Sequence, residues 1–298
     1  MDLKRTQKGL TTVIAAVIIG LCAVWSALGG CDILQTNTGP VIELSEVPEF
    51  SGEAYVEING GVPEFNEEDM TERSFERYSR LDALGRCGTA YANLCVDTMP
   101  TEERGNIGMV KPSGWQTSKY DFVDGKYLYN RCHLIGYQLS GENANERNLI
   151  TGTRYMNTEG MLPFENEVAE YIDETGNHVL YRVTPVFEGD EMLARGVVME
   201  AMSVEDNGSG VCFNVYCYNV QPGVTIDYAT GENELSDSLT EPDGGESRLY
   251  ILNTGSKKYH LPSCEGAQNM NEDNRSEFTG TSGQLEIMGY SPCGSCNP

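Results

Sequence analysis

The order of the hydrophobic patterns between residues 126 and 220 restricts the fold more than any other feature of this chain. Residues 126–135 alternate and then turn apolar, which predicts a strand, and the apolar residues of 162–174 recur on one face, which predicts a helix. Three strand patterns follow, at residues 178–187, 192–204 and 211–220. A strand, an irregular segment, a helix and then consecutive strands favour an α+β fold with an antiparallel sheet over a doubly wound parallel sheet.

The N-terminus has the composition of a targeting segment. Basic residues at the start precede an uncharged, mostly apolar run from Leu10 to Gly30, and Cys31 follows directly. Small residues before a cysteine are typical of a bacterial lipoprotein signal, which would place a lipid on Cys31. The run is also long enough to span a bilayer, so residues 1–31 could instead be an uncleaved signal anchor. In both cases the basic residues stay inside, and the rest of the chain is expected outside the cytoplasm, tethered to the membrane.

The remaining chain divides into four segments by composition. Residues 32–51 lack periodicity and contain prolines, which predicts a tether, whereas residues 52–231 have a globular composition. Residues 232–247 carry six acidic residues and no lysine or arginine, which predicts a linker. Residues 248–298 form a tail near the lower size limit for folding unaided, so we expect a metal or another cross-link to stabilise it.

The chain is strongly acidic. Its net charge of −25 argues against a generally cationic surface that coats nucleic acid. Bulk charge of this sign repels phosphate rather than attracting it. A function that requires phosphate binding would therefore depend on local positive charge and on a metal ion.

The cysteine count is informative because the chain is expected to be exported. Ten cysteines in such a protein would usually indicate disulfides. Five of them belong to the main globular segment: Cys87, Cys95, Cys132, Cys212 and Cys217. Because five is an odd number, at least one of these cysteines has no partner within the set.

The stretch around His133 combines residue types that suit phosphodiester chemistry. His133 is one of three histidines and lies two places from Arg131. A histidine with a pKa near 6.5 can take a proton from water near neutrality, and an arginine can contact phosphate through two hydrogen bonds. Asparagines within the next two dozen residues offer neutral oxygen ligands for a hard cation such as magnesium. Taken alone, however, a lone histidine more often has a structural role.

Longer segments around the histidine change that interpretation. Arg131-Cys132-His133, Asn148-Leu149-Ile150 and Arg154-Tyr155-Met156-Asn157 resemble the ββα-metal DNA/RNA non-specific endonuclease family, in particular its secreted streptococcal-type branch. The resemblance covers roughly Gly52 to Asp227 and implies a ββα-metal nuclease core. It includes four further segments: Tyr78–Arg86, Pro100–Arg104, Lys111–Trp115 and Tyr181–Pro185.

Carried over residue by residue, the resemblance implies roles for five side chains. His133 would be the general base that deprotonates the attacking water, and Asn157 would be the direct ligand of a catalytic Mg²⁺. Asn148 would help to hold the loop and the metal-bound waters, and Glu165 would hydrogen-bond to metal-bound water. Arg131 would support the site or contact phosphate.

The motif departs from the family hallmark, Asp-Arg-Gly-His, at two positions. Asn130 stands in place of the aspartate, which removes a charge but keeps the hydrogen-bonding shape, and Cys132 stands in place of the glycine. Neither change removes the base or the metal ligand, so we expect an active enzyme. Four other basic residues are candidates for a local phosphate track: Arg104, Lys111, Arg154 and Arg182.

The tail contains a separate cluster of metal-ligand residues. His260 and Cys264 are four residues apart, and Cys293 and Cys296 are three apart. Two close pairs of such ligands suit a tetrahedral structural Zn²⁺ site, which would explain how a short tail folds. The arrangement resembles the small zinc-binding module of the Ada DNA-repair protein, with His260 in place of a cysteine. A disulfide between two of the three cysteines is the alternative.

Together these features predict an exported, membrane-tethered, Mg²⁺-dependent endonuclease that cuts DNA and RNA without strong sequence preference. The expected partners are nucleic-acid substrates and the membrane, and an immunity or uptake partner stays open. A noncatalytic surface lipoprotein that binds nucleic acid is the alternative, but the presence of both His133 and Asn157 favours an enzyme. A metal-trafficking lipoprotein would require more histidine and cysteine ligands in the main segment.

Overall fold

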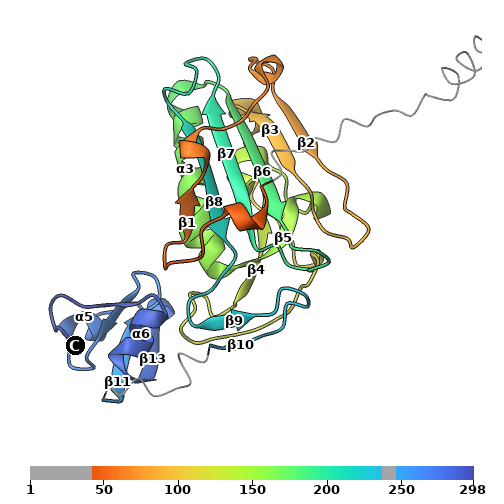
Figure 1. Ribbon diagram of the computed structural model, residues 1–298. Coiled ribbons are helices and arrows are strands. Elements are labelled where there is room, and N and C mark those ends of the chain that lie inside the picture. Colours follow the sequence, from red (N-terminus) through yellow and green to blue (C-terminus); the bar gives the residue numbers. More distant parts are fainter. Residues whose placement is uncertain (1–41, 237–245) are drawn as a thin grey trace, which may run out of the picture. The chain divides into compact units, whose positions relative to one another are not determined.

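The computed structural model describes residues 42–236 and 246–298, and its largest element is a six-stranded antiparallel sheet (Figure 1). The strand order is β1-β8-β7-β6-β3-β2. The strands are β1 (Tyr55–Glu57), β2 (Phe75–Tyr78), β3 (Ala90–Leu94), β6 (Val179–Val186), β7 (Gly196–Ser203) and β8 (Cys212–Tyr218). The predicted α+β class and antiparallel sheet are confirmed.

The register of the strands sends alternate side chains to two buried layers. On one face, the cross-strand neighbours Ala92, Tyr181, Ala201 and Phe213 form an apolar row. These residues belong to the same hydrophobic core as the inner face of helix α3 (Leu162–Thr175). The helix covers this face of the sheet because its apolar residues recur at helical spacing.

The opposite face carries a charged pair in its centre. Tyr91, Arg182, Glu200 and Asn214 are cross-strand neighbours there, and Glu200 is fully buried. Arg182 donates two hydrogen bonds to the Glu200 carboxylate, at 2.7 and 2.9 Å. The backbone N–H of Glu64 donates to the same carboxylate at 2.9 Å. The buried charges are thus paired and hydrogen-bonded, which an interior ion pair requires.

Residues from the N-terminal side cover the rest of that face. Ile42, Leu44 and Val47 pack against a cluster that contains Tyr216 and Tyr218. The second half of the segment expected as a tether, residues 32–51, is therefore part of the folded domain. The reason is that its few apolar side chains cover the second face of the sheet, which the pattern of the segment alone does not reveal.

A separate hairpin precedes helix α3. Strands β4 (Tyr129–His133) and β5 (Leu149–Thr153) pair with each other and not with the main sheet. Between them lies the short helix α2 (Tyr137–Ser140), and after β5 a π-helical turn (Met156–Met161) leads into α3. A π-helical turn is rare and often marks a functional site.

The C-terminal segment forms a second, four-stranded sheet with the order β13-β11-β12-β14. Its elements are β11 (Arg248–Asn253), β12 (Lys258–His260), α5 (Glu265–Gln268), β13 (Arg275–Gly280), α6 (Ser282–Ile287) and β14 (Ser291–Pro292). Tyr250, Leu252, Tyr259 and Leu285 are buried within it. The predicted acidic linker begins with an ordered strand, because β10 (Asn233–Leu235) pairs with β9 (Val224–Ile226).

Short 3-10 helices complete the described secondary structure. They are Leu44–Glu46, Asn59–Gly61, Glu67–Asp69, Val96–Thr98, Glu146–Asn148 and Glu272–Asn274. The predicted helix and the three predicted strands after it correspond to α3, β6, β7 and β8. Strand β7 starts four residues later than predicted, because the N–H groups of Met192 and Leu193 both donate to the Tyr228 carbonyl instead of pairing within the sheet.

The cysteines of the described residues are free thiols: Cys87, Cys95, Cys132, Cys212, Cys217, Cys264, Cys293 and Cys296. Residues 1–31, with the proposed lipidation site Cys31, lie outside the described part of the chain. Within residues 42–236 and 246–298, no helix has the length and apolar character needed to cross a bilayer.

Removing one partner of the buried ion pair should strongly destabilise the protein, since the other charge would remain in the interior without its counter-ion. We expect Glu200→Ala and Arg182→Ala each to lower the free energy of unfolding by about 3–5 kcal/mol in urea denaturation followed by circular dichroism. The control is the double variant Arg182→Met with Glu200→Leu, which leaves no unpaired charge and should recover most of the loss. A double variant no more stable than the single ones would contradict this explanation.

Candidate active site

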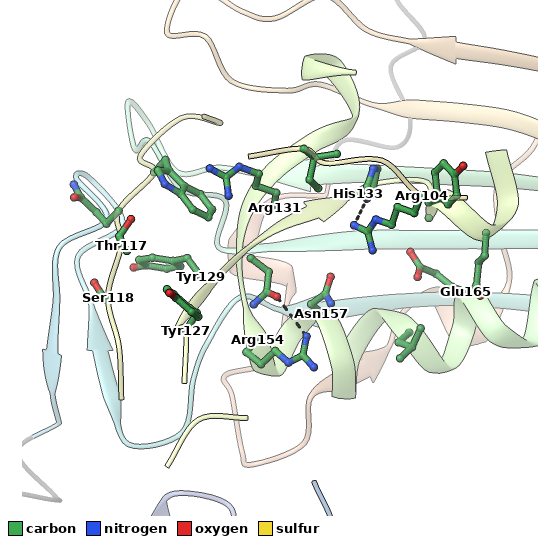
Figure 2. A pocket seen from close by; sticks show the side chains of 18 residues that line it. Arg104, Thr117, Ser118, Tyr127, Tyr129, Arg131, His133, Arg154, Asn157 and Glu165 are labelled. Carbon is green, nitrogen blue, oxygen red and sulfur yellow. Dashed lines mark hydrogen bonds between the residues drawn. The ribbon is translucent and has the colours of Figure 1, made fainter. Parts of the chain in front are cut away.

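A cavity of about 780 Å³ brings together most of the residues predicted for the site (Figure 2). Its walls come from β4, α2, the π-helical turn, the start of α3 and two loops. Four of the five side chains singled out in the motif region line it, namely Arg131, His133, Asn157 and Glu165. Asn148 does not belong to the lining.

His133 is held in one orientation and one tautomer. The side chain, on β4, is only 7% exposed, and its Nε2 lies 2.8 Å from the backbone carbonyl of Asn143. A carbonyl only accepts hydrogen bonds, so Nε2 carries the proton and Nδ1 keeps its lone pair. The Nη2 atom of Arg104 lies 3.4 Å from Nδ1 of His133. Burial lowers the pKa of His133 below its usual value, and the Arg104 guanidinium lowers it further, so the ring is neutral and basic near pH 7.

Asn148 fixes the turn that follows His133. Its Oδ1 accepts a hydrogen bond from the Ile135 N–H at 2.9 Å, and its Nδ2 donates to the Ile135 carbonyl at 3.0 Å. Its own carbonyl accepts from the Leu134 N–H at 2.9 Å. The side chain is fully buried, so both of its hydrogen-bonding groups serve the loop. The structure therefore places Asn148 where it positions the backbone beside the catalytic candidate.

Asn157 and Glu165 supply oxygen atoms to the cavity. Asn157 is in the π-helical turn, and its side chain makes no hydrogen bond to the described residues, which leaves the amide oxygen free for a ligand. Glu165 lies in the first turn of α3, where burial raises the pKa of its carboxyl group to about 7. A Cβ at Gly136 would lie 2.9 Å from this carboxyl group, so the glycine leaves room for it.

Arg131 supports the wall of the cavity. Its guanidinium donates to the carbonyls of Val110 and Gly108, and its Cζ lies 3.9 Å from the centroid of the Trp115 ring. Of the two roles implied for Arg131, support of the site is the one these contacts serve. Because its partners are neutral carbonyls and a ring, Arg131 also contributes an uncompensated positive charge.

The predicted phosphate track is only partly present. Arg104 and Arg154 line the cavity, whereas Lys111 is exposed outside it. Arg182 is excluded because the register of β6 turns it to the buried face with Glu200. Pairing across strands, which a single segment does not reveal, decides the position of this arginine.

The two departures from the family hallmark have local explanations. Asn130 accepts a hydrogen bond from Arg154 at 3.4 Å, while its buried Nδ2 has no hydrogen-bond partner among the described residues. Cys132 is fully buried in the main core. A Cβ at Gly152, on the paired strand, would overlap the Cys132 sulfur, so Gly152 provides the space that the larger residue needs.

Sequence reasoning missed several parts of the site. Any residue can supply a carbonyl, so nothing marked Asn143 as the partner of His133. Nothing in the sequence marked Gly136 as a residue of the site. The aromatic residues Trp115 and Tyr127 line the same cavity, and their closeness to the motif in sequence could have indicated them.

The four predicted ligands of the C-terminal segment converge. The ligand atoms of His260, Cys264, Cys293 and Cys296 all lie within 4.8 Å of one another, and the first three residues are buried. Backbone N–H groups of Cys296 and Ser295 lower the pKa of Cys293 to about 7, which favours the thiolate that a metal requires. The predicted cluster therefore forms a group that can hold a metal ion.

Comparison with known proteins identifies the main domain. A sequence model of the DNA/RNA non-specific endonuclease family matches residues 66–205. A deoxyribonuclease of Streptococcus dysgalactiae subsp. equisimilis is 29% identical over 125 residues, which cover 40% of this chain. The alignment spans only 37% of that protein's length.

Solved structures agree with this assignment. Streptococcus agalactiae NucA with a bound magnesium ion superposes with a TM-score of 0.54 and 26% identity, covering 60% of this chain and 87% of NucA. The Sda1 nuclease with a bound zinc ion is 30% identical over 54% of this chain and 81% of Sda1, with a TM-score of 0.49. Residues 66–205 thus match the DNA/RNA non-specific endonuclease family, and the fold of the main domain is similar to that of NucA.

Proposed function

We propose that this protein is an exported, membrane-tethered endonuclease that hydrolyses phosphodiester bonds of DNA and RNA, with Mg²⁺ as cofactor and His133 as general base. The observation that carries the proposal is the fixed tautomer of His133, whose unprotonated Nδ1 lies in a cavity with two oxygen donors and three guanidinium groups. A noncatalytic nucleic-acid-binding protein would have no need of a buried, oriented base.

The first step rests on His133. Its Nδ1 accepts the proton of a water molecule as that water attacks phosphorus, and the Asn143 carbonyl stabilises the imidazolium that forms by accepting from Nε2. Asn148 keeps the adjoining backbone in place during this change of charge. Arg104 is exposed and lies next to Nδ1, so it can leave the histidine and contact the entering phosphate.

The donor set fits a hard divalent cation. Asn157 offers a neutral amide oxygen that is not hydrogen-bonded within the described chain, and Glu165 adds a carboxyl group to the same cavity. Magnesium prefers such oxygen ligands and keeps several waters, so one direct protein ligand suffices. We assign Asn157 as that ligand and Glu165 as a hydrogen-bond acceptor for its waters. When bound, Mg²⁺ would stabilise the negative charge on the phosphate and the leaving oxygen.

Positive charge beside the base compensates for the acidic chain. Arg104 and Arg131 form no ion pair with a described residue, while Arg154 shares its charge with Asp124 at 2.6 Å. These guanidinium groups can bind a phosphate through charge-assisted hydrogen bonds. We therefore assign phosphate binding to Arg104 and, less directly, to Arg154.

The proposal also covers the cellular location of the protein and a structural zinc ion. A lipid on Cys31 or an uncleaved anchor within residues 1–31 would tether the enzyme outside the cytoplasm. In the C-terminal segment, we assign His260, Cys264, Cys293 and Cys296 to a structural Zn²⁺, because four close ligands of these types suit tetrahedral zinc.

Removing the base should abolish most of the activity. We expect His133→Ala to reduce Mg²⁺-dependent degradation of plasmid DNA and of RNA by about 10²–10⁴-fold, and EDTA to abolish degradation by the unmodified protein. The matched control is His178→Ala, since His178 lies outside the cavity and pairs with Glu205. Near-normal activity of the His133→Ala variant would contradict the assignment of His133 as general base.

The pH profile should report the lowered pKa of His133. The neutral ring is the active form, so kcat/KM should rise through a midpoint below 6.5 and stay high above it. In Arg104→Ala the positive charge beside Nδ1 is gone, and the midpoint should move to higher pH. Profiles of both proteins at constant ionic strength measure this, and an unchanged midpoint in the variant would argue against the contact between Arg104 and His133.

The C-terminal cluster should retain zinc through purification. We expect about one tightly held zinc per cluster by mass spectrometry of the purified full-length protein, and a loss of most of it in His260→Ala. His178→Ala serves again as the control. Zinc-free protein in which thiol titration shows two of the three tail cysteines oxidised would favour the alternative disulfide.

A further inference from the structure

The cavity has two chemically different ends (Figure 2). His133, Arg104 and Glu165 lie at one end, and Tyr127, Tyr129, Thr117 and Ser118 lie at the other. The assigned chemistry uses the first end together with Asn157 and Arg154, which lie between the two ends, and it leaves the four residues of the second end without a role. Tyr127 and His133 are six residues apart along extended chain, which separates them by roughly 20 Å at the rise of a strand. This distance exceeds the reach of the two nucleotides that flank a cleaved bond.

Tyr127 is an exposed ring on a rigid support. Its side chain is 48% exposed, and its hydroxyl makes no hydrogen bond to the described residues. An antiparallel bridge between Lys119 and Tyr127 fixes the backbone, and the Leu128 N–H donates to the Ser118 carbonyl. The Lys119 ammonium lies 4.4 Å from the ring centroid, so a positive charge accompanies the ring. A fixed, exposed aromatic ring beside a cation suits a ligand with both a flat face and negative charge.

Trp115 lines the same cavity. Arg131 covers its ring at 3.9 Å and is itself fixed by the carbonyls of Gly108 and Val110. Trp115 also packs against a hydrophobic cluster that includes Leu193. Both aromatic residues are thus ordered before any ligand arrives, which lowers the entropic cost of binding.

The acidic composition of the chain makes such a surface useful. A net charge of −25 opposes the binding of a polyanion by electrostatics alone. Stacking of a base on an aromatic ring does not depend on the sign of the protein's charge, and it tolerates sequence because every base has a flat face. A base within a duplex is already stacked on its neighbours and is not available to a side chain.

From these observations we infer that Tyr127, in a cavity that Trp115 also lines, is a stacking subsite for an unpaired base of the substrate strand, several nucleotides from the cleaved bond. This subsite deepens the proposed nuclease function and rests on it. It gives the enzyme a preference for single-stranded or frayed nucleic acid over fully paired duplex. Lys119 neutralises a phosphate next to the stacked base.

The cleavage test compares substrates of different reach. We expect Tyr127→Ala to lower kcat/KM at least tenfold on a single-stranded 12-mer, a larger loss than on the matching duplex or on the p-nitrophenyl ester of thymidine 5′-phosphate, which is too short to reach the ring. Tyr127→Phe keeps the flat ring and should restore most of the loss. The control is Tyr55→Ala, which removes a tyrosine of similar exposure (43%) outside the cavity and should leave cleavage normal. Equal losses on all three substrates would overturn the subsite.

A binding test separates this inference from the nuclease assignment. A series of single-stranded DNAs, each with one 2-aminopurine at a different position, is titrated with the His133→Ala protein. The 2-aminopurine fluorescence should be quenched at one position, and this quenching should be absent with the double variant His133→Ala/Tyr127→Ala. Quenching that depends on Tyr127, together with no cleavage by the unmodified protein in Mg²⁺, would keep the subsite and reject the nuclease. Cleavage by the unmodified protein without Tyr127-dependent quenching would keep the nuclease and reject the subsite.

Discussion

A sheet that is buried on both faces is the constraint on which the rest of the structure depends. Because side chains alternate along a strand, β6 and β7 send one set of residues into the core with α3 and the other set into the layer that contains Arg182 and Glu200. Neither face is free for a polar reaction. The site is therefore built from the β4–β5 hairpin and the π-helical turn, which are outside the main sheet.

The position of His133, which we propose as the general base, depends on Asn143 and Asn148. The Asn143 carbonyl determines which nitrogen of His133 carries the proton, and Asn148 uses its whole amide to hold the Ile135 backbone. A neutral, buried ring in one tautomer is a usable base near pH 7, whereas an exposed histidine would lose this orientation. Gly136 and Gly152 contribute by leaving space for Glu165 and Cys132.

Electrostatics in this molecule are local. Half of the described arginines in the main domain form ion pairs with carboxylates, as in the pairs Arg182–Glu200, Arg154–Asp124 and Arg195–Glu191. Arg104 and Arg131 are the exceptions within the cavity, since neither forms an ion pair with a carboxylate of the described residues. In the proposed function, phosphate binds at this position of an otherwise acidic protein, and the inferred aromatic subsite adds binding that the negative charge of the chain does not oppose.

The sequence by itself determined the fold class, the order of α3, β6, β7 and β8, the motif around His133, and the four ligands of the tail. These features are local, because periodicity and spacing follow from the geometry of a single helix, strand or loop. Only the tertiary structure placed Arg182 in the core instead of the site, packed residues 42–47 onto the sheet, and brought Arg104 beside His133. These placements depend on contacts between residues far apart in the chain, which the pattern of one segment does not encode.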